Sequence, residues 1–149
     1  MPSPVVDHRP SPAMLRVINP IMRTLLLSPA ARLLPDSLGV LEFSGRRTGK
    51  RYRVVVGSHD VAGAKAVFTS APWSRNFRGG APVVLIQEGR RRHGSGTLIE
   101  DPEAVARAFQ TVIDEGAPPR ALGLEVPDGH RMTGEDVRAV GRVMIRIDA

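Results

Sequence analysis

Two predicted strands and the turn between them occupy residues 38–58, which read LGVLEFSGRRTGKRYRVVVGS. The segments 38–44 and 50–58 are short, rich in Val, Phe and Tyr, and bounded by Gly or Ser, a pattern typical of strands. Alternation along the second segment puts Arg51 and Arg53 on one face and Tyr52 on the other. We therefore expect a hairpin with one cationic face.

The strand pattern continues along the chain at a spacing of about ten residues. Further candidate strands lie at 64–70, 82–88, 93–99 and 143–147. Asp101 as N-cap, Pro102 as the first helical residue and Gly116 beyond the end predict one helix. Thr133 and Asp136 mark the start of a second, short helix. The pattern is mainly β, an antiparallel sheet or small barrel with one or two helices after the strands.

The first 27 residues precede the strands and differ from them in composition. Residues 1–12 carry four prolines, which predicts an extended, mobile arm ahead of a single domain over 13–149. Residues 13–27 have apolar side chains at helical spacing, with Pro20 as a kink. This amphipathic helix packs on the domain or lies on an anionic membrane surface. It is too charged for a membrane span and lacks a signal-peptide cleavage site, so we expect a cytoplasmic protein.

Composition narrows the functional classes. A chain of 149 residues fits one domain, and the absence of cysteine excludes disulfides, iron–sulfur clusters, thiolate zinc sites and cysteine nucleophiles. The net charge of +6 is uneven, because residues 42–99 hold 11 basic and three acidic residues while the last fifty hold six and ten. Five of the six aromatic residues also lie in 42–99. We therefore expect one site for an anionic cofactor rather than a nucleic acid wrapped around the whole surface.

The turn 45–50, GRRTGK, is a candidate phosphate-binding site. Gly45 and Gly49 allow successive backbone N–H groups to point into one concavity. The turn is not a nucleoside-triphosphate P-loop, because three residues instead of four separate the glycines and an arginine, not Ser or Thr, follows Lys50. A solvated hairpin tip is the alternative interpretation.

A second candidate segment follows the third strand and reads SAPWSRNFRGG. A proline near its start can open a short helix, which puts Trp73, Asn76 and Phe77 on one face and two arginines on another. The N-terminal end of such a turn also favours an anion. Trp73 either anchors the loop in the core or forms a wall of a ring-binding cleft.

Other chemistries fit the sequence poorly. The four histidines are far apart, with no pair at metal-ligand spacing, so we expect no metal site. No Gly-x-Ser-x-Gly elbow is present, and neither Ser44 nor Ser70 has an evident base beside it. The three arginines at 90–92 are most simply a solvated hairpin tip.

The two candidate segments together resemble the deazaflavin-dependent nitroreductase family, small actinobacterial flavin and deazaflavin oxidoreductases. The family pattern is a Gly-Arg-(Arg/Lys)-(Ser/Thr)-Gly turn, a strand, and Trp-x-x-Asn-(Leu/Phe) before another strand, and residues 45–53 and 73–83 match it. The resemblance covers roughly residues 13–100. It implies a split β-barrel of about six antiparallel strands, with an N-terminal helix and one or two helices after the strands, that holds coenzyme F420.

The resemblance also assigns residues to the cofactor site by position. These are Arg46, Arg47, Thr48, Gly49, Lys50, Arg53, Ser70, Trp73 and Asn76. The implied reaction is hydride transfer from reduced F420 to a quinone, a nitro compound or an enone, which needs positioning rather than a catalytic side chain. Two features depart from the family: only two residues separate Ser70 from Trp73, where a longer Gly-rich loop is usual, and no tyrosine follows Tyr52 to shape a substrate pocket.

Three other hypotheses stay open at this point. The same barrel can hold FMN, a basic barrel with exposed rings can bind single-stranded nucleic acid, and a small-ligand protein can bind without turnover. Under the leading hypothesis the partner is a small-molecule hydride acceptor and no nucleic acid is expected. A peripheral membrane contact through residues 13–27 stays open, as does the choice between monomer and homodimer.

Overall fold

The computed structural model describes residues 3–7, 20–28 and 37–149. Residues 20–26 form a helix at the edge of the described chain. The other helices are α2 (Pro102–Asp114), α3 (Gly134–Val140) and the 3₁₀ helices η2 (Pro72–Phe77) and η3 (Pro119–Leu122). The strands are β1 (Val6–Asp7), β2 (Leu38–Ser44), β3 (Arg51–Gly57), β4 (His59–Val61), β5 (Ala64–Thr69), β6 (Ala81–Gln87), β7 (Arg90–Ile99), β8 (Leu124–Glu125) and β9 (Val143–Asp148).

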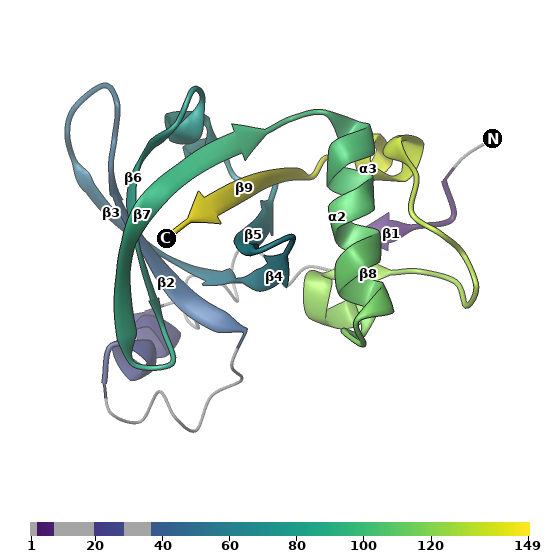
Figure 1. The fold of residues 1–149 in the computed structure, drawn as a ribbon, viewed down its shortest axis with the longest axis horizontal. Helices are drawn as coiled ribbons and strands as arrows, with labels where there is room; N and C mark the ends of the chain where they lie inside the picture. The colour runs from purple at the N-terminus through teal and green to yellow at the C-terminus, as the bar shows by residue number, and fades with distance from the viewer. Residues whose placement is uncertain (1–2, 8–19, 29–36) are drawn as a thin grey trace.

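The main sheet has seven strands in the order β3-β2-β6-β7-β9-β5-β4, and every neighbouring pair is antiparallel. Figure 1 shows this sheet curling into a half-barrel, with α2 and α3 beside it. A second sheet pairs β1 with β8. The predicted fold class, mainly β with a few helices, is confirmed, with seven strands in the main sheet in place of about six.

Most strand bounds match the sequence pattern, and β7 is the exception. The predicted strand 93–99 begins at Arg90 instead. Glu88 and Gly89 have φ angles of 53° and 73°, so a two-residue turn connects β6 to β7 and Arg90 already pairs with Gln87. The arginines expected at a solvated hairpin tip are therefore residues of the strand.

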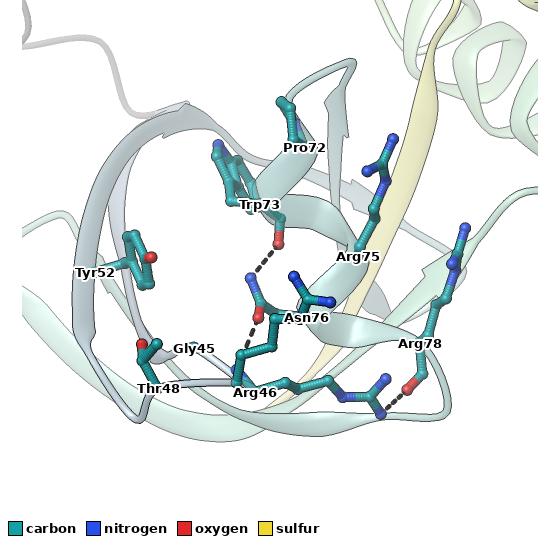
Figure 2. A pocket seen from close by; sticks show the side chains of 10 residues that line it. Gly45, Arg46, Thr48, Tyr52, Pro72, Trp73, Arg75, Asn76 and Arg78 are labelled. Atoms are coloured by element: carbon teal, nitrogen blue, oxygen red, sulfur yellow. Dashed lines mark hydrogen bonds between the residues drawn. The ribbon is translucent and has the colours of Figure 1, made fainter.

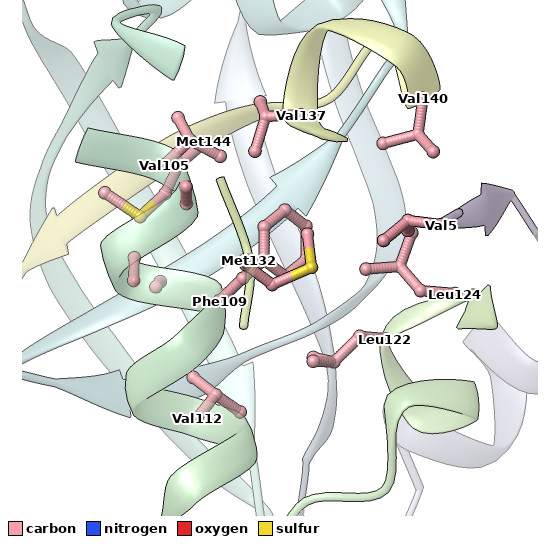
Figure 3. Close-up of a cluster of buried hydrophobic side chains, with 13 residues drawn as sticks. Val5, Val105, Phe109, Val112, Leu122, Leu124, Met132, Val137, Val140 and Met144 are labelled. Carbon is pink, nitrogen blue, oxygen red and sulfur yellow. The ribbon is translucent and has the colours of Figure 1, made fainter. Parts of the chain in front are cut away.

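Three apolar clusters hold the sheet and helices together. One cluster, around Phe109, packs α2 and α3 against the outer face of β5 and β9 (Figure 3). Another joins Leu26 of the short helix to Val40 and Ile86 on the outer face of β2 and β6. The third, the inner cluster, fills the concave face of the sheet and consists of Leu41, Phe43, Val56, Val67, Phe77, Val83, Leu85, Leu98, Ile145 and Ile147. Tyr52 and Trp73 extend this inner cluster toward one end of the sheet.

The caps of α2 and α3 confirm where the sequence predicts these two helices to begin. The Asp101 side chain accepts a hydrogen bond from the Glu103 amide at 3.3 Å, and Pro102 opens α2. Gly116, with φ of 106°, follows its end. Thr133 and Asp136 form a reciprocal capping box at the start of α3.

The N-terminal segment is bound to the domain in its described part. Residues 3–7 are extended, as expected, but Val5 is buried and Val6–Asp7 pairs with β8. Arg142 also donates to the Asp7 carboxylate at 2.9 Å. In its described part, the segment predicted as an extended, mobile arm is extended and contacts the domain through Val5, β1 and Asp7. Residues 1–2 and 8–12 lie outside the described residues.

The predicted amphipathic helix over 13–27 is described only from residue 20 onward. Within that part, Leu26 is buried on the sheet, whereas Ile21, Leu25 and Leu27 are exposed. Residues 13–19 lie outside the described residues, so the kink at Pro20 is untested. Among the described helices, none has the length and apolar character needed to cross a membrane.

Candidate functional site

A cavity of about 670 Å³ lies at the end of the half-barrel, where the turn between β2 and β3 faces η2 (Figure 2). This volume is within the usual range for small-molecule and cofactor sites. Two segments, residues 45–52 and 72–78, build it. The lining residues are Gly45, Arg46, Arg47, Thr48, Tyr52, Pro72, Trp73, Arg75, Asn76 and Arg78.

The turn 45–50 uses three of its six backbone amides to hold its shape. The Gly45 amide donates to the Lys50 carbonyl at 2.8 Å, and the Gly49 amide donates to the Gly45 carbonyl at 2.9 Å. The Lys50 amide donates to Thr48 Oγ1 at 3.2 Å. Within the described chain, the Arg47 and Thr48 amides make no hydrogen bond. The expected concavity of successive N–H groups is thus limited to two neighbouring amides.

The 3₁₀ helix η2 is fixed in the core by its last residue. Pro72 opens the helix as predicted, and Phe77 is fully buried in the inner cluster. A Cβ atom added at Gly96 of β7 would lie 2.8 Å from Phe77 Cδ1, so this glycine leaves the room that the ring occupies. Phe77 therefore anchors η2, while Pro72, Trp73, Arg75 and Asn76 line the cavity.

Aromatic rings gather behind the cavity. Phe43 stacks on Tyr52 with ring centroids 5.4 Å apart, and it contacts Trp73 at 5.5 Å and Phe77 at 5.0 Å. Trp73 is half-buried: it packs against the inner cluster and also lines the cavity. Phe68, the fifth aromatic residue of the basic segment, stacks on Phe109 in another cluster.

Four arginines line the cavity, and their side chains differ in what they already bind. The Arg78 guanidinium pairs with Glu100 at 3.0 Å, and the Arg46 guanidinium donates to the Arg78 carbonyl. In the described residues, the Arg47 and Arg75 side chains make no hydrogen bond or ion pair. These two guanidinium groups are therefore the cations of the cavity lining that have no partner within the described residues.

Arg53 does not reach the cavity. It lies on the other face of β3 from Tyr52, where its Nε is 3.3 Å from Oε1 of Glu42. The Glu42 side chain is 2% exposed and also pairs with Arg91 at 2.9 Å. The strand alternation had already separated Arg53 from Tyr52, but the position of its acidic partner depends on the pairing of β2 with β3.

The other predicted site residues divide into two groups. Arg46, Arg47, Thr48, Trp73 and Asn76 line the cavity, whereas Gly49, Lys50 and Ser70 do not. Lys50 lies close by, with Nζ 5.7 Å from the centre of the Tyr52 ring. The structure adds lining residues that were not assigned to the site: Gly45, Tyr52, Pro72, Arg75 and Arg78. Tyr52 was detectable, because alternation put it on the face opposite the strand arginines.

Titratable groups with displaced pKa values lie outside the cavity. Burial, with Lys65 nearby, lowers the pKa of His59 from its ordinary 6.5, and Asp60 opposes only part of this effect. Burial acts to raise the pKa of Asp136, but hydrogen bonds with Ser3, His130 and Thr133 outweigh it and lower the pKa below 3.8. Across the described ranges, no group of three or more His, Asp or Glu side chains could hold a metal ion.

Comparisons with known proteins bear on the fold. No family model matches the sequence, and no curated protein matches it. The fold occurs in a solved mycobacterial protein. The crystal structure of the conserved hypothetical protein Rv2991 from Mycobacterium tuberculosis matches with a TM-score of 0.50 and 18% identity, over 97% of this chain and 83% of that chain. At this identity the similarity shows a shared fold and says nothing about shared chemistry.

Proposed function

We propose that this protein is an F420-dependent oxidoreductase that reduces a quinone, a nitro compound or an enone. One observation carries the proposal: Arg47 and Arg75, whose guanidinium groups lack partners in the described structure, line the same cavity as Tyr52 and Trp73. A flat cofactor with an anionic chain needs cations and rings side by side in this way. The sequence resemblance and the half-barrel fold support the same function.

The residues present fit such a cofactor in size and charge. The cavity volume of about 670 Å³ accommodates a drug-sized ligand. Charged groups of the cofactor's phosphodiester and carboxylates can accept hydrogen bonds from Arg47 and Arg75 and from the amides of Arg47 and Thr48. Tyr52 and Trp73 provide an apolar wall of the kind that flat rings require.

Each part of the site then has a defined task. Arg47 and Arg75 bind the anionic part, while Trp73 and Tyr52 flank the ring and exclude water from one side. A bound reduced deazaflavin supplies the hydride. Because the protein contributes orientation rather than proton transfer, the proposal needs no catalytic acid or base.

FMN is a second candidate, because its single phosphate needs fewer partners than the longer anionic chain of F420 does. Within the described residues, Arg47 and Arg75 are the two lining arginines whose guanidinium groups make no hydrogen bond or ion pair. The short connection between Ser70 and Trp73 also leaves fewer backbone groups for a longer anionic chain.

A side-by-side titration tests the proposal. Trp73 is the sole tryptophan, so its fluorescence reports directly on the cavity. F420 should quench it saturably and more tightly than FMN, and reduced F420 should be oxidised steadily in the presence of a panel of quinones, nitro compounds and enones. Binding without turnover would leave a ligand-binding protein, and salt-dependent binding of oligonucleotides in place of F420 would favour the nucleic-acid hypothesis.

A further inference from the structure

Asn76 uses both ends of its side-chain amide within the protein. Its Oδ1 accepts a hydrogen bond from the Arg46 backbone amide at 2.9 Å, and its Nδ2 donates to the Trp73 carbonyl at 2.8 Å (Figure 2). Arg46 belongs to the turn between β2 and β3, whereas Trp73 belongs to η2. The amide therefore joins the two segments that form opposite sides of the cavity.

A second hydrogen bond makes the same connection further along η2. The Arg46 guanidinium donates to the carbonyl of Arg78, the residue that caps η2. Arg78 is held in turn by Glu100 at 3.0 Å. The backbone and the side chain of Arg46 thus bind two separate points of η2.

These contacts matter because the two sides of the cavity are anchored independently. Phe77 fixes η2 in the inner cluster, whereas the turn extends from the β2–β3 hairpin and its residues 46–50 are exposed. The hydrogen bonds within the turn set its own shape but not its distance from η2. The contacts of Asn76 and Arg46 do set that distance.

We propose that Asn76 is a positioning residue that fixes the width of the cavity before a ligand arrives, and that it does not contact the ligand. The sequence resemblance had placed it among the cofactor contacts. Only the identity of the ligand rests on the proposed function, since the hydrogen bonds exist in the ligand-free protein. Preorganisation of this kind raises affinity because the ordering cost is met on folding rather than on binding.

Two variants and a matched control test this role in the ligand-free protein. Asn76→Ala removes both hydrogen bonds, and Asn76→Asp keeps an acceptor for the Arg46 amide but loses the donor to the Trp73 carbonyl. Arg75→Ala is the control, because Arg75 lies in the same helix and lines the cavity without joining the two sides. The readouts are hydrogen exchange of the Arg46 amide by NMR and acrylamide quenching of Trp73.

The proposed positioning role of Asn76 predicts a different pattern for each variant. Asn76→Ala should lower the protection of the Arg46 amide by about 2- to 10-fold, the range expected for one net hydrogen bond, and should make Trp73 more accessible to acrylamide. Asn76→Asp should retain that protection and change only the quenching of Trp73. Arg75→Ala should leave both readouts at wild-type values while weakening the binding of F420.

The opposite pattern would overturn the proposal. If Asn76→Ala weakened F420 binding while Arg46 protection and Trp73 quenching in the free protein stayed at wild-type values, Asn76 would be a direct ligand contact. If Asn76→Ala failed to fold, the Asn76→Asp pattern would decide by itself. If the ligand-free variants changed as predicted but wild type did not bind F420, the positioning role of Asn76 would be supported and the proposed function would be contradicted.

Discussion

Arg47 and Arg53 lie only six residues apart, but replacing one should affect ligand affinity and replacing the other should affect stability. Arg47 lines the cavity without an intramolecular partner in the described structure, whereas Arg53 lies on the other face of the sheet in an ion pair with Glu42. We therefore predict that Arg47→Ala weakens F420 binding and leaves stability nearly unchanged. Arg53→Ala should do the reverse.

The size of each effect follows from burial and partners. A hydrogen bond between a charged donor and an anion contributes about 1.5–3 kcal/mol, and the exposure of Arg47 favours the lower end, so Arg47→Ala should raise the Kd roughly tenfold. Arg53→Ala leaves the buried Glu42 carboxylate with Arg91 at 2.9 Å as its remaining partner in the described structure. Because Arg53 is half-exposed, the loss should be about 1–2 kcal/mol of unfolding free energy rather than the full cost of an unpaired buried charge.

Both quantities can be measured on the same purified proteins. Isothermal calorimetry with F420 gives the Kd, and urea denaturation followed by circular dichroism gives the free energy of unfolding. The two variants remove the same charge from neighbouring positions, so each controls for the other. A tenfold loss of affinity in Arg53→Ala, or none in Arg47→Ala, would refute the assignment of the anion site to the cavity.

Three further predictions concern stability. Asp136→Asn should lower the free energy of unfolding by about 1–3 kcal/mol at pH 7. Because the pKa of Asp136 is lowered in the folded state, this loss should shrink as the pH falls below about 4. A loss that stayed constant in urea denaturation from pH 7 to 3 would contradict this prediction. The lowered pKa of His59 means that wild type loses stability as pH falls below about 6.5, and His59→Gln should reduce that loss in thermal melts between pH 7 and 5. Phe77→Ala should lower the free energy of unfolding by about 3–5 kcal/mol and expose Trp73 to acrylamide, whereas a loss near zero would mean that η2 is anchored elsewhere.

The predictable parts of the fold are those with local signals. Alternation and flanking turn residues define β2 as 38–44, and the Asp101 cap with Pro102 defines the start of α2. The strands that were missed depend on distant partners or are very short: β1 exists because it pairs with β8, and β4 spans three residues beside β5. No local pattern carries such pairings, because their register is set by packing in the folded chain.

The candidate site shows the same division. The turn and the segment around Trp73 were recognisable as motifs, and they do meet at one cavity. What each side chain binds was not recognisable, since Arg53 is held by Glu42 across a strand pair and Asn76 by Arg46 across thirty residues of sequence. Residue type and spacing thus indicate the place of a site, whereas the roles within it depend on tertiary contacts.

The assignment of an anionic ring cofactor to this cavity is tested most directly by titrating F420 into wild type and into the Arg47→Ala/Arg75→Ala double variant, with the fluorescence of Trp73 as the readout. We predict saturable one-site quenching in wild type and a Kd raised at least tenfold in the double variant. Both proteins should retain the same far-ultraviolet circular dichroism spectrum. Absence of saturable quenching in wild type, or equal affinities for the two proteins, would contradict the claim that this cavity holds an anionic ring cofactor.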